Sequence, residues 1–159
     1  MTIMRVSLVG TSLTDLQKET MANRLIEAFA TIEVGHASPA VRNGFLVQFE
    51  QLDRTDLWMG ERPMVDASNS GKAAVVSARV MAGPWNPEMK SELFAKIEAV
   101  VREVADMPKE GTGTNFWMTF VEVPEGAWGV GGRTVSIESL APVFAEDRQQ
   151  RIKNHLAPE

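Results

Sequence analysis

The sequence contains no cysteine and no tyrosine, and its only histidines are His36 and His155. The lack of cysteine excludes disulfides, thiolate zinc sites and a cysteine nucleophile, and the lack of tyrosine excludes a phenol as acid or base. The two histidines lack metal-ligand spacing, and each is expected on the surface. No phosphate-loop or dinucleotide-binding glycine motif is present either. We therefore expect no metal and no other cofactor.

The chain has no surplus of positive charge and no long apolar run. Its 16 Lys and Arg stand against 21 Asp and Glu, a net charge of −5, which argues against nucleic acid as a partner. No uncharged apolar run approaches the roughly 20 residues of a membrane-spanning helix, so no membrane partner is expected. The first residues alternate in polarity, unlike the apolar core of a signal peptide. A cytoplasmic protein is expected.

The sequence contains enough hydrophobic residues for a single domain, and their spacing predicts strands and helices. Its 159 residues are 44% hydrophobic, which suits one domain over residues 1–159. Residues 4–8 alternate apolar and polar side chains, which predicts a strand. Leu16, Met21, Leu25 and Phe29 then follow helical spacing after a cap at Thr14 or Asp15. Residues 36–43 are expected to be a loop, and residues 45–52 a second strand.

The same order of elements then recurs. Residues 74–81 predict a strand, Asn86 and Pro87 begin a helix, and residues 116–123 predict another strand. Residues 45–52 match residues 116–123 at an offset of 71, and Lys18 matches Lys90 at an offset of 72. We therefore predict internal repeats at 1–60 and 73–136, joined by a connector at 61–72. The fold class is α/β (α+β): two tandem β-α-β units, each with parallel strands, form a four-stranded sheet with both helices on one face.

Two features follow from this architecture. The sheet face without helices would expose apolar side chains, which predicts an oligomer. After the last strand, three glycines in four residues predict a tight hairpin. The C-terminal extension, residues 137–159, carries Phe144, Arg148, Ile152 and Leu156 and predicts a short extra helix.

One stretch of the second unit carries a resemblance to a known family. Its strand ends Val-Glu-Val-Pro and is followed by Trp128 and then Gly-Val-Gly-Gly, closing a strand–helix–strand unit. This pattern resembles the 4-oxalocrotonate tautomerase group of the tautomerase superfamily, and the doubled unit resembles its fused members. The resemblance covers about residues 1–136 and is strongest near residues 116–133. It implies a homotrimer in which an N-terminal proline acts as base or acid and arginines hold a substrate carboxylate.

The residues that this family uses are replaced here. The catalytic proline falls near Met1 to Ile3 in the first unit and on Ala74 in the second, and the family's arginine positions also carry other residues. A primary α-amine, at Met1 or at Thr2 after removal of methionine, has a pKa near 7.7–8.0 and can act as a base or form a Schiff base. Met1 and Thr2 are therefore the catalytic candidates, beside the alternative of an ordinary frayed terminus.

The substrate-binding candidates are three arginines and one tryptophan. Arg5 and Arg79 lie in the matching first strands of the two units and should face the oligomer interior. They would bind an anion there, or, as we favour, pair with carboxylates between chains. Those carboxylates would include Glu50 or Glu122. Arg133 follows the glycine hairpin and is a second anion candidate or, more simply, a solvated charge.

Tryptophans are assigned by their place in the elements. Trp128, in the glycine-rich turn, matches the aromatic wall of the family's pocket or packs in an interface. Trp117 is expected in the core, and Trp58 and Trp85 in packing. The predicted ligand is a small carboxylate or carbonyl compound.

The predicted function is keto–enol isomerisation, or a related reaction, of a small carbonyl or enol carboxylate. The alternative is a catalytically silent trimer of the same superfamily that binds a ligand or has a structural role.

Overall fold

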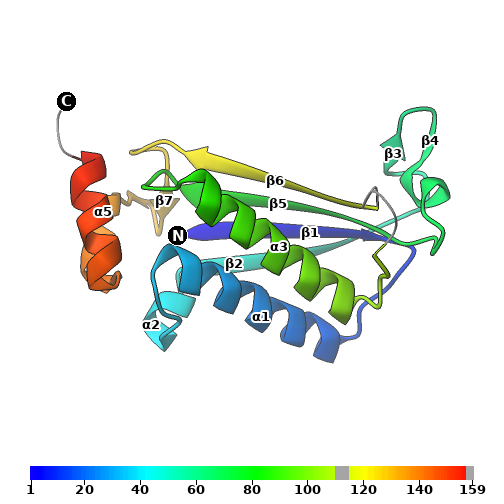
Figure 1. Ribbon diagram of the computed structural model, residues 1–159, viewed down its shortest axis with the longest axis horizontal. Coiled ribbons are helices and arrows are strands. Elements are labelled where there is room, and N and C mark those ends of the chain that lie inside the picture. Colours follow the sequence, from blue (N-terminus) through cyan, green and yellow to red (C-terminus); the bar gives the residue numbers. More distant parts are fainter. Residues whose placement is uncertain (110–114, 157–159) are drawn as a thin grey trace.

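Four strands form the central sheet of the computed structural model, which describes residues 1–109 and 115–156 (Figure 1). Their spatial order is β2-β1-β5-β6. The strands are β1 (Thr2–Val9), β2 (Phe45–Leu52), β5 (Ala73–Met81) and β6 (Phe116–Val123). The pairs β1–β2 and β5–β6 are parallel, as predicted, whereas β1 and β5 are antiparallel. The centre of the sheet is therefore the contact between the two units.

Both long helices, α1 (Asp15–Glu33) and α3 (Pro87–Val104), lie on the same face of the sheet (Figure 1), which confirms the predicted layers. Thr14 caps α1 by accepting a hydrogen bond from the Gln17 backbone N–H, and the Asn86 side chain accepts one from Met89 N–H at the start of α3. These contacts satisfy amide groups that a helix start leaves unpaired.

The main hydrophobic core fills the space between the helices and the sheet. Phe29 of α1 is fully buried at its centre and contacts the rings of Phe45, Trp85 and Phe120. Trp85 meets Phe120 edge-on at a centroid distance of 4.9 Å, so the packing role predicted for Trp85 is confirmed.

The opposite face of the sheet is uncovered in the single chain. Leu46 and Trp117 are each 57% exposed there, and Val121 is 48% exposed. Trp117 therefore does not lie in the core, because its place in the alternation of β6 puts it on the face without helices. Glu122 is on the helix side, where its carboxylate pairs with Lys90 Nζ at 2.6 Å, so it is unavailable to arginines of the open face.

The register of the ladders aligns the two units residue by residue. Thr2 pairs with Phe45 in the first unit and Ala74 with Phe116 in the second. Thr2 N–H donates to Gly44 O at 3.1 Å and Ala74 N–H donates to Asn115 O at 2.9 Å. Thr2 is thus the counterpart of Ala74. By the same register Arg5 corresponds to Ser77 and not to Arg79, although the two arginines do lie in matching strands.

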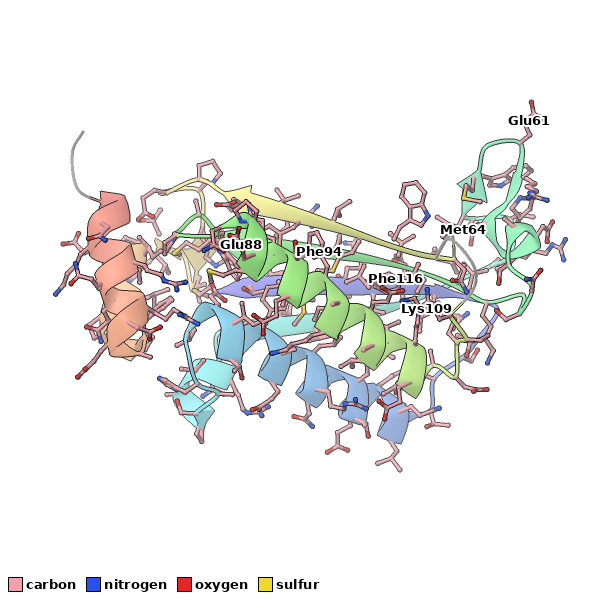
Figure 2. The ribbon with its side chains drawn as sticks, viewed as in Figure 1. Glu61, Met64, Glu88, Phe94, Lys109 and Phe116 are labelled. Carbon is pink, nitrogen blue, oxygen red and sulfur yellow. The ribbon has the colours of Figure 1, made fainter. Side chains whose placement is uncertain are left out.

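Each unit continues into a small hairpin. β3 (Trp58–Met59) pairs with β4 (Arg62–Pro63) after β2, and β7 (Gly129–Val130) pairs with β8 (Arg133–Thr134) after β6. The predicted glycine hairpin is therefore present, and Gly131 and Gly132 have the positive φ angles, 58° and 76°, that its turn requires. The first hairpin lies partly within the range assigned to the connector, and the helix η1 (Met64–Ala67) follows it. Figure 2 shows Glu61 at the tip of that hairpin, pointing away from the sheet.

Two regions differ from or add to the expected elements. The loop predicted at residues 36–43 contains a short helix, α2 (Pro39–Arg42), whose first position is a proline. The C-terminal segment comprises α4 (Ile137–Leu140), η2 (Ala141–Val143) and α5 (Glu146–Leu156), so the extra helix is present. The C-terminal segment lies with the N-terminus, α2 and β7 at one end of the sheet (Figure 1). We call this the Glu33 end, after the last residue of α1. Hairpin β3–β4 lies at the other end, which we call the Arg102 end after a residue in the last turn of α3. Across the described residues no helix has the length and apolarity to cross a membrane.

Candidate functional site

A carboxylate is buried at the C-terminal end of α1. Met21, Leu25 and Phe29 form a ladder of buried residues four positions apart on this helix, and Glu33 is the next position of the ladder. Glu33 is only 8% exposed. Carboxylates are rarely buried to this degree without a partner, because burial disfavours the charged form. Its position therefore calls for an explanation beyond packing.

The polar partners of Glu33 come from the start of the chain. The hydroxyl of Thr2 donates to Glu33 Oε2 at 3.3 Å, and the N-terminal nitrogen of Met1 lies 4.0 Å from Glu33 Oε1. Burial raises the pKa of the Glu33 carboxyl above its ordinary value of 4.5, and the N-terminal ammonium and the Thr2 hydroxyl offset only part of that rise. A carboxyl with a raised pKa can exchange a proton nearer to neutral pH than an exposed glutamate can.

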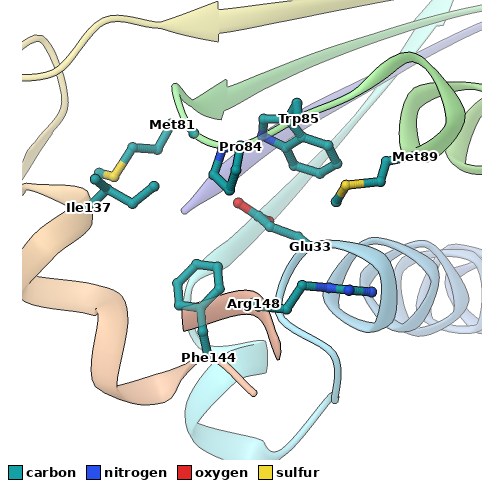
Figure 3. Close-up of a pocket in the computed structure, with 9 residues that line it drawn as sticks. Glu33, Met81, Pro84, Trp85, Met89, Ile137, Phe144 and Arg148 are labelled. Carbon is teal, nitrogen blue, oxygen red and sulfur yellow. The ribbon is translucent and has the colours of Figure 1, made fainter. Parts of the chain in front are cut away.

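A narrow, mainly apolar pocket surrounds this carboxyl (Figure 3). Its free volume is about 10 Å³, close to what one water molecule needs. Figure 3 shows Glu33 projecting from the end of α1 toward Pro84 and Trp85, with Phe144 and Arg148 of the C-terminal segment on the other side. The remaining lining residues are Met81, Gly83, Met89 and Ile137.

A wider cavity of about 200 Å³ lies at the N-terminus. Met1 and Thr2 line it together with Trp128, so the structure brings these three candidates together. Trp128 is 7% exposed and packs in a second hydrophobic cluster with Phe144 and Ile152. The ring thus joins the wall of this cavity to the C-terminal segment.

The three candidate arginines do not line either cavity. Arg5 and Arg79 are exposed on the open face of the sheet, on the polar side of the alternation as predicted, and Arg133 is exposed on β8. Within the described part of the chain none of the three forms an ion pair. Glu50, a predicted partner of these arginines between chains, accepts a hydrogen bond from the Ser7 hydroxyl of its own chain at 2.7 Å.

At the Arg102 end, the corresponding positions carry different residues and a different set of hydrogen bonds. The counterparts of Glu33 and Thr2 there are Ala105 and Ala74, both buried, and neither side chain can exchange a proton. The buried cation Arg102 donates to Pro108 O at 2.7 Å and to Asn115 Oδ1 at 3.1 Å. These bonds tie α3 to the start of β6, so this end resembles a structural closure.

Histidines and metal ligands add nothing to either site. His36 is exposed, as predicted, and its Nε2 lies 2.9 Å from Val143 O. The side chain of His155 lies outside the described residues. Across residues 1–109 and 115–156, no three His, Asp or Glu side chains are placed to hold a metal ion.

Sequence patterns did not single out Glu33 or assign a site role to Arg148. A signal for Glu33 was present, since it continues the four-residue ladder of buried positions in α1. Arg148 was recognised only as part of a helix. Its approach to the pocket depends on a contact between segments more than 100 residues apart: Arg148 Nε donates to Ile32 O at 3.1 Å across 116 positions.

No protein-family profile and no curated protein matches the sequence, but the structure is similar to several solved structures. Native fused 4-OT aligns with a TM-score of 0.64 and 22% identity, over 83% of this chain and 94% of that chain. A symmetric trimer of fused 4-OT aligns with a TM-score of 0.65 and 16% identity, over 87% and 98%. Pt0534 inactivated by 2-oxo-3-pentynoate gives 0.64 and 14%, over 87% and 98%. The chain therefore has the fused 4-OT fold.

Proposed function

We propose that the chain is a tautomerase-superfamily enzyme that isomerises a small carbonyl compound at the Glu33 end, with Glu33 transferring the proton. One observation carries the proposal: the buried carboxyl of Glu33 lies against the start of β1, with the Thr2 hydroxyl 3.3 Å and the N-terminal nitrogen 4.0 Å away. In the family that the sequence resembles, the reactive group is at this start. The fold supports membership of that superfamily.

The proposed reaction is a 1,3-proton shift between an enol and its ketone. A base removes the proton from the enol oxygen, the C=C electrons take a proton at the neighbouring carbon, and the C=O bond forms, so no co-reactant is needed. Glu33 in its neutral form delivers the proton to carbon. The resulting carboxylate is stabilised by the Thr2 hydroxyl and the N-terminal ammonium until it recovers a proton from the protonated base or from water.

The α-amino group is the proposed partner of Glu33, as predicted for Met1 and Thr2. As an ammonium it stabilises the Glu33 carboxylate, and as a free amine it can serve as a base. If Met1 is removed, the amine moves to Thr2. That residue is the counterpart of Ala74, where the second unit has an internal amide and no amine. This difference favours one reactive site per chain.

We further propose that three copies assemble through the open faces of their sheets. The open face exposes Leu46, Trp117 and Val121, and such an apolar surface favours burial against another chain. Arg5 and Arg79 would then lie at the interface, where they pair with carboxylates or bind an anion. A fused 4-OT of similar fold is described as a symmetric trimer, which supports the same assembly here.

A second function is favoured by one observation, the narrowness of the Glu33 pocket. A free volume of about 10 Å³ admits no organic substrate without movement of the surrounding segments. A silent trimer that binds a ligand in the wider cavity of about 200 Å³ would need no such movement. Measurement of catalysis separates the two functions.

The deciding experiment is the ketonisation of the enol of phenylpyruvate, followed by absorbance. We expect the protein to exceed the buffer rate and Glu33→Gln to lower kcat/KM by about 100-fold or more, as for loss of a general acid or base. The matched control is Glu19→Gln, an exposed glutamate of the same helix, which should change the rate less than twofold. A rate no higher than buffer for several enols would favour the silent trimer.

The role of the amine is tested by blocking it. Acetylation of the α-amino group, or two residues added before Met1, should lower the rate while Glu33 stays in place. An unchanged rate would show that Glu33 acts without the amine.

Assembly is tested by light scattering. We expect a mass near three times the chain mass of 17.5 kDa, and Trp117→Glu should reduce it, because the charge would be buried in the interface. A wild-type monomer would contradict the proposed assembly.

A further inference from the structure

The C-terminal segment is built onto the Glu33 end by specific contacts. Ala145 N–H donates to Val34 O at 2.8 Å, directly after Glu33. A Cβ added to Gly35 would lie 2.6 Å from Ala145 Cβ, and one added to Gly83 would lie 2.8 Å from Ile137 Cδ1. Both glycines therefore permit an approach that a larger residue would block. The segment is a fitted part of the pocket wall.

Arg148 is the cation that this segment brings to the pocket. Its Nε donates to Ile32 O at 3.1 Å, one residue before Glu33, and its side chain is 20% exposed. The pocket residues otherwise offer apolar surface and the Glu33 carboxyl. Figure 3 shows the Arg148 side chain extending past the base of Glu33 at the end of α1, with its guanidinium directed away from the Glu33 carboxyl.

The guanidinium also has donors left for a ligand. Its Nη1 donates to Asp147, whose side chain is 63% exposed, and its Nη2 has no polar partner among the described residues. An exposed intrachain carboxylate is a weak competitor, whereas a ligand carboxylate can meet the Nη1–Nη2 edge of the planar guanidinium with two parallel hydrogen bonds.

Building on the proposed isomerisation, we infer that Arg148 binds the carboxylate of the substrate in the Glu33 pocket and so selects small 2-oxo acids with an apolar side chain. The apolar walls made by Met81, Trp85 and Phe144 receive the side chain. The carboxylate displaces Asp147 from the guanidinium, and the C-terminal segment moves outward to admit the ligand, since the closed pocket holds only about 10 Å³.

A purely structural role for Arg148 has to be separated from this one. The last turn of α1 has no basic residue of its own, and a cation at a helix C-terminus stabilises the helix. Arg148 supplies that cation through its bond to Ile32 O. Loss of the side chain would therefore lower stability in either case, and the test has to compare two ligands that differ only in charge.

The experiment measures the dissociation constants of phenylpyruvate and of its methyl ester by tryptophan fluorescence. We expect Arg148→Gln to weaken binding of the acid by about 10- to 100-fold, as for loss of a charge-assisted pair, and binding of the ester less than twofold. Arg148→Lys should recover part of the affinity, and Asp147→Asn should tighten binding of the acid. Lys153→Gln, an exposed cation of the same helix, is the matched control.

Equal losses for acid and ester, or no loss for either, would overturn the inference. If Arg148→Gln fails to fold, the unchanged acid-to-ester ratio of Arg148→Lys and Asp147→Asn would overturn it as well. Failure of the proposed function is visible separately. An inactive wild type whose acid affinity depends on Arg148 rejects the isomerisation alone, and an active one with an unchanged KM in Arg148→Gln rejects the inference alone.

Discussion

The two ends of the sheet are made by the same unit and closed in different ways. At the Glu33 end a buried carboxyl meets the chain start through the Thr2 hydroxyl at 3.3 Å. At the Arg102 end a buried cation meets Asn115 Oδ1 at 3.1 Å and Pro108 O at 2.7 Å, and the counterpart of Glu33 is Ala105. A doubled unit can thus keep its backbone register while one end acquires a proton-exchanging group and the other a structural closure.

The comparison also shows what makes one end suited to chemistry. Arg102 donates hydrogen bonds to Glu98, Pro108 and Asn115, and these bonds contribute to stability. The Glu33 carboxyl has only the Thr2 hydroxyl at 3.3 Å and the N-terminal nitrogen at 4.0 Å as polar partners among the described residues, and burial raises its pKa. A group kept in a costly environment is a candidate for function, which the following substitutions test.

The largest expected difference in stability comes from exchanging each buried charge for its neutral amide. Arg102→Gln should lower the free energy of unfolding by about 2–3 kcal/mol, because the buried Asn115 side chain loses a charged donor. Glu33→Gln should leave the free energy of unfolding at neutral pH equal or higher, because no charge has to be buried. Urea denaturation at a fixed protein concentration measures both. A destabilised Glu33→Gln with an unaffected Arg102→Gln would reverse the assignment of the two ends.

A smaller difference is expected between the hairpins. Trp128→Leu gives the second hairpin the residue that the first has at the matching position, Leu57, and should cost about 1–2 kcal/mol, because Trp128 is buried with Phe144 and Ile152. Trp58→Leu should change stability by less than about 0.5 kcal/mol, because that ring is exposed. Thermal unfolding of the two variants compares them. Equal losses of stability in the two variants would mean that the two tryptophans contribute equally to the stability of the fold.

The last difference is the part of the pH dependence of stability that Glu33 contributes. The raised pKa means that the folded state holds the Glu33 proton more tightly than the unfolded chain does. The corresponding stability is fully present below the ordinary pKa of glutamate and is lost as pH rises through the raised pKa, with a slope of at most about 1.4 kcal/mol per pH unit. Urea midpoints from about pH 4 to about pH 8 should therefore fall more in the wild type than in Glu33→Gln. Parallel curves for the two proteins would contradict the raised pKa.

Much of the fold was predictable because the determinants are local. Alternation placed β2 and β6, a capping residue placed the start of α1, and the offset between Phe45 and Phe116 revealed the doubling. Alternation could not tell which face of β6 the helices cover, so Trp117 was assigned to the core although it is exposed on the open face.

The site was less predictable because its contacts are not local. Met1, Thr2 and Trp128 were named from the resemblance, and the structure places all three around one cavity. Glu33 lies 31 positions from Thr2, so only the fold shows that the chain start reaches it. Arg148 belongs to a segment outside the resemblance, and nothing in its helical spacing indicates where that segment docks.

The most direct test of a single reactive end is covalent labelling with 2-oxo-3-pentynoate, the inactivator named for the similarly folded Pt0534. A free amine adds to its electron-poor alkyne and leaves an adduct of the summed mass. After trypsin, we predict the adduct on the peptide of residues 1–5, with labelling prevented by phenylpyruvate. An adduct at Lys72 near the Arg102 end, with residues 1–5 unmodified, would contradict the assignment of the reactive site to the Glu33 end.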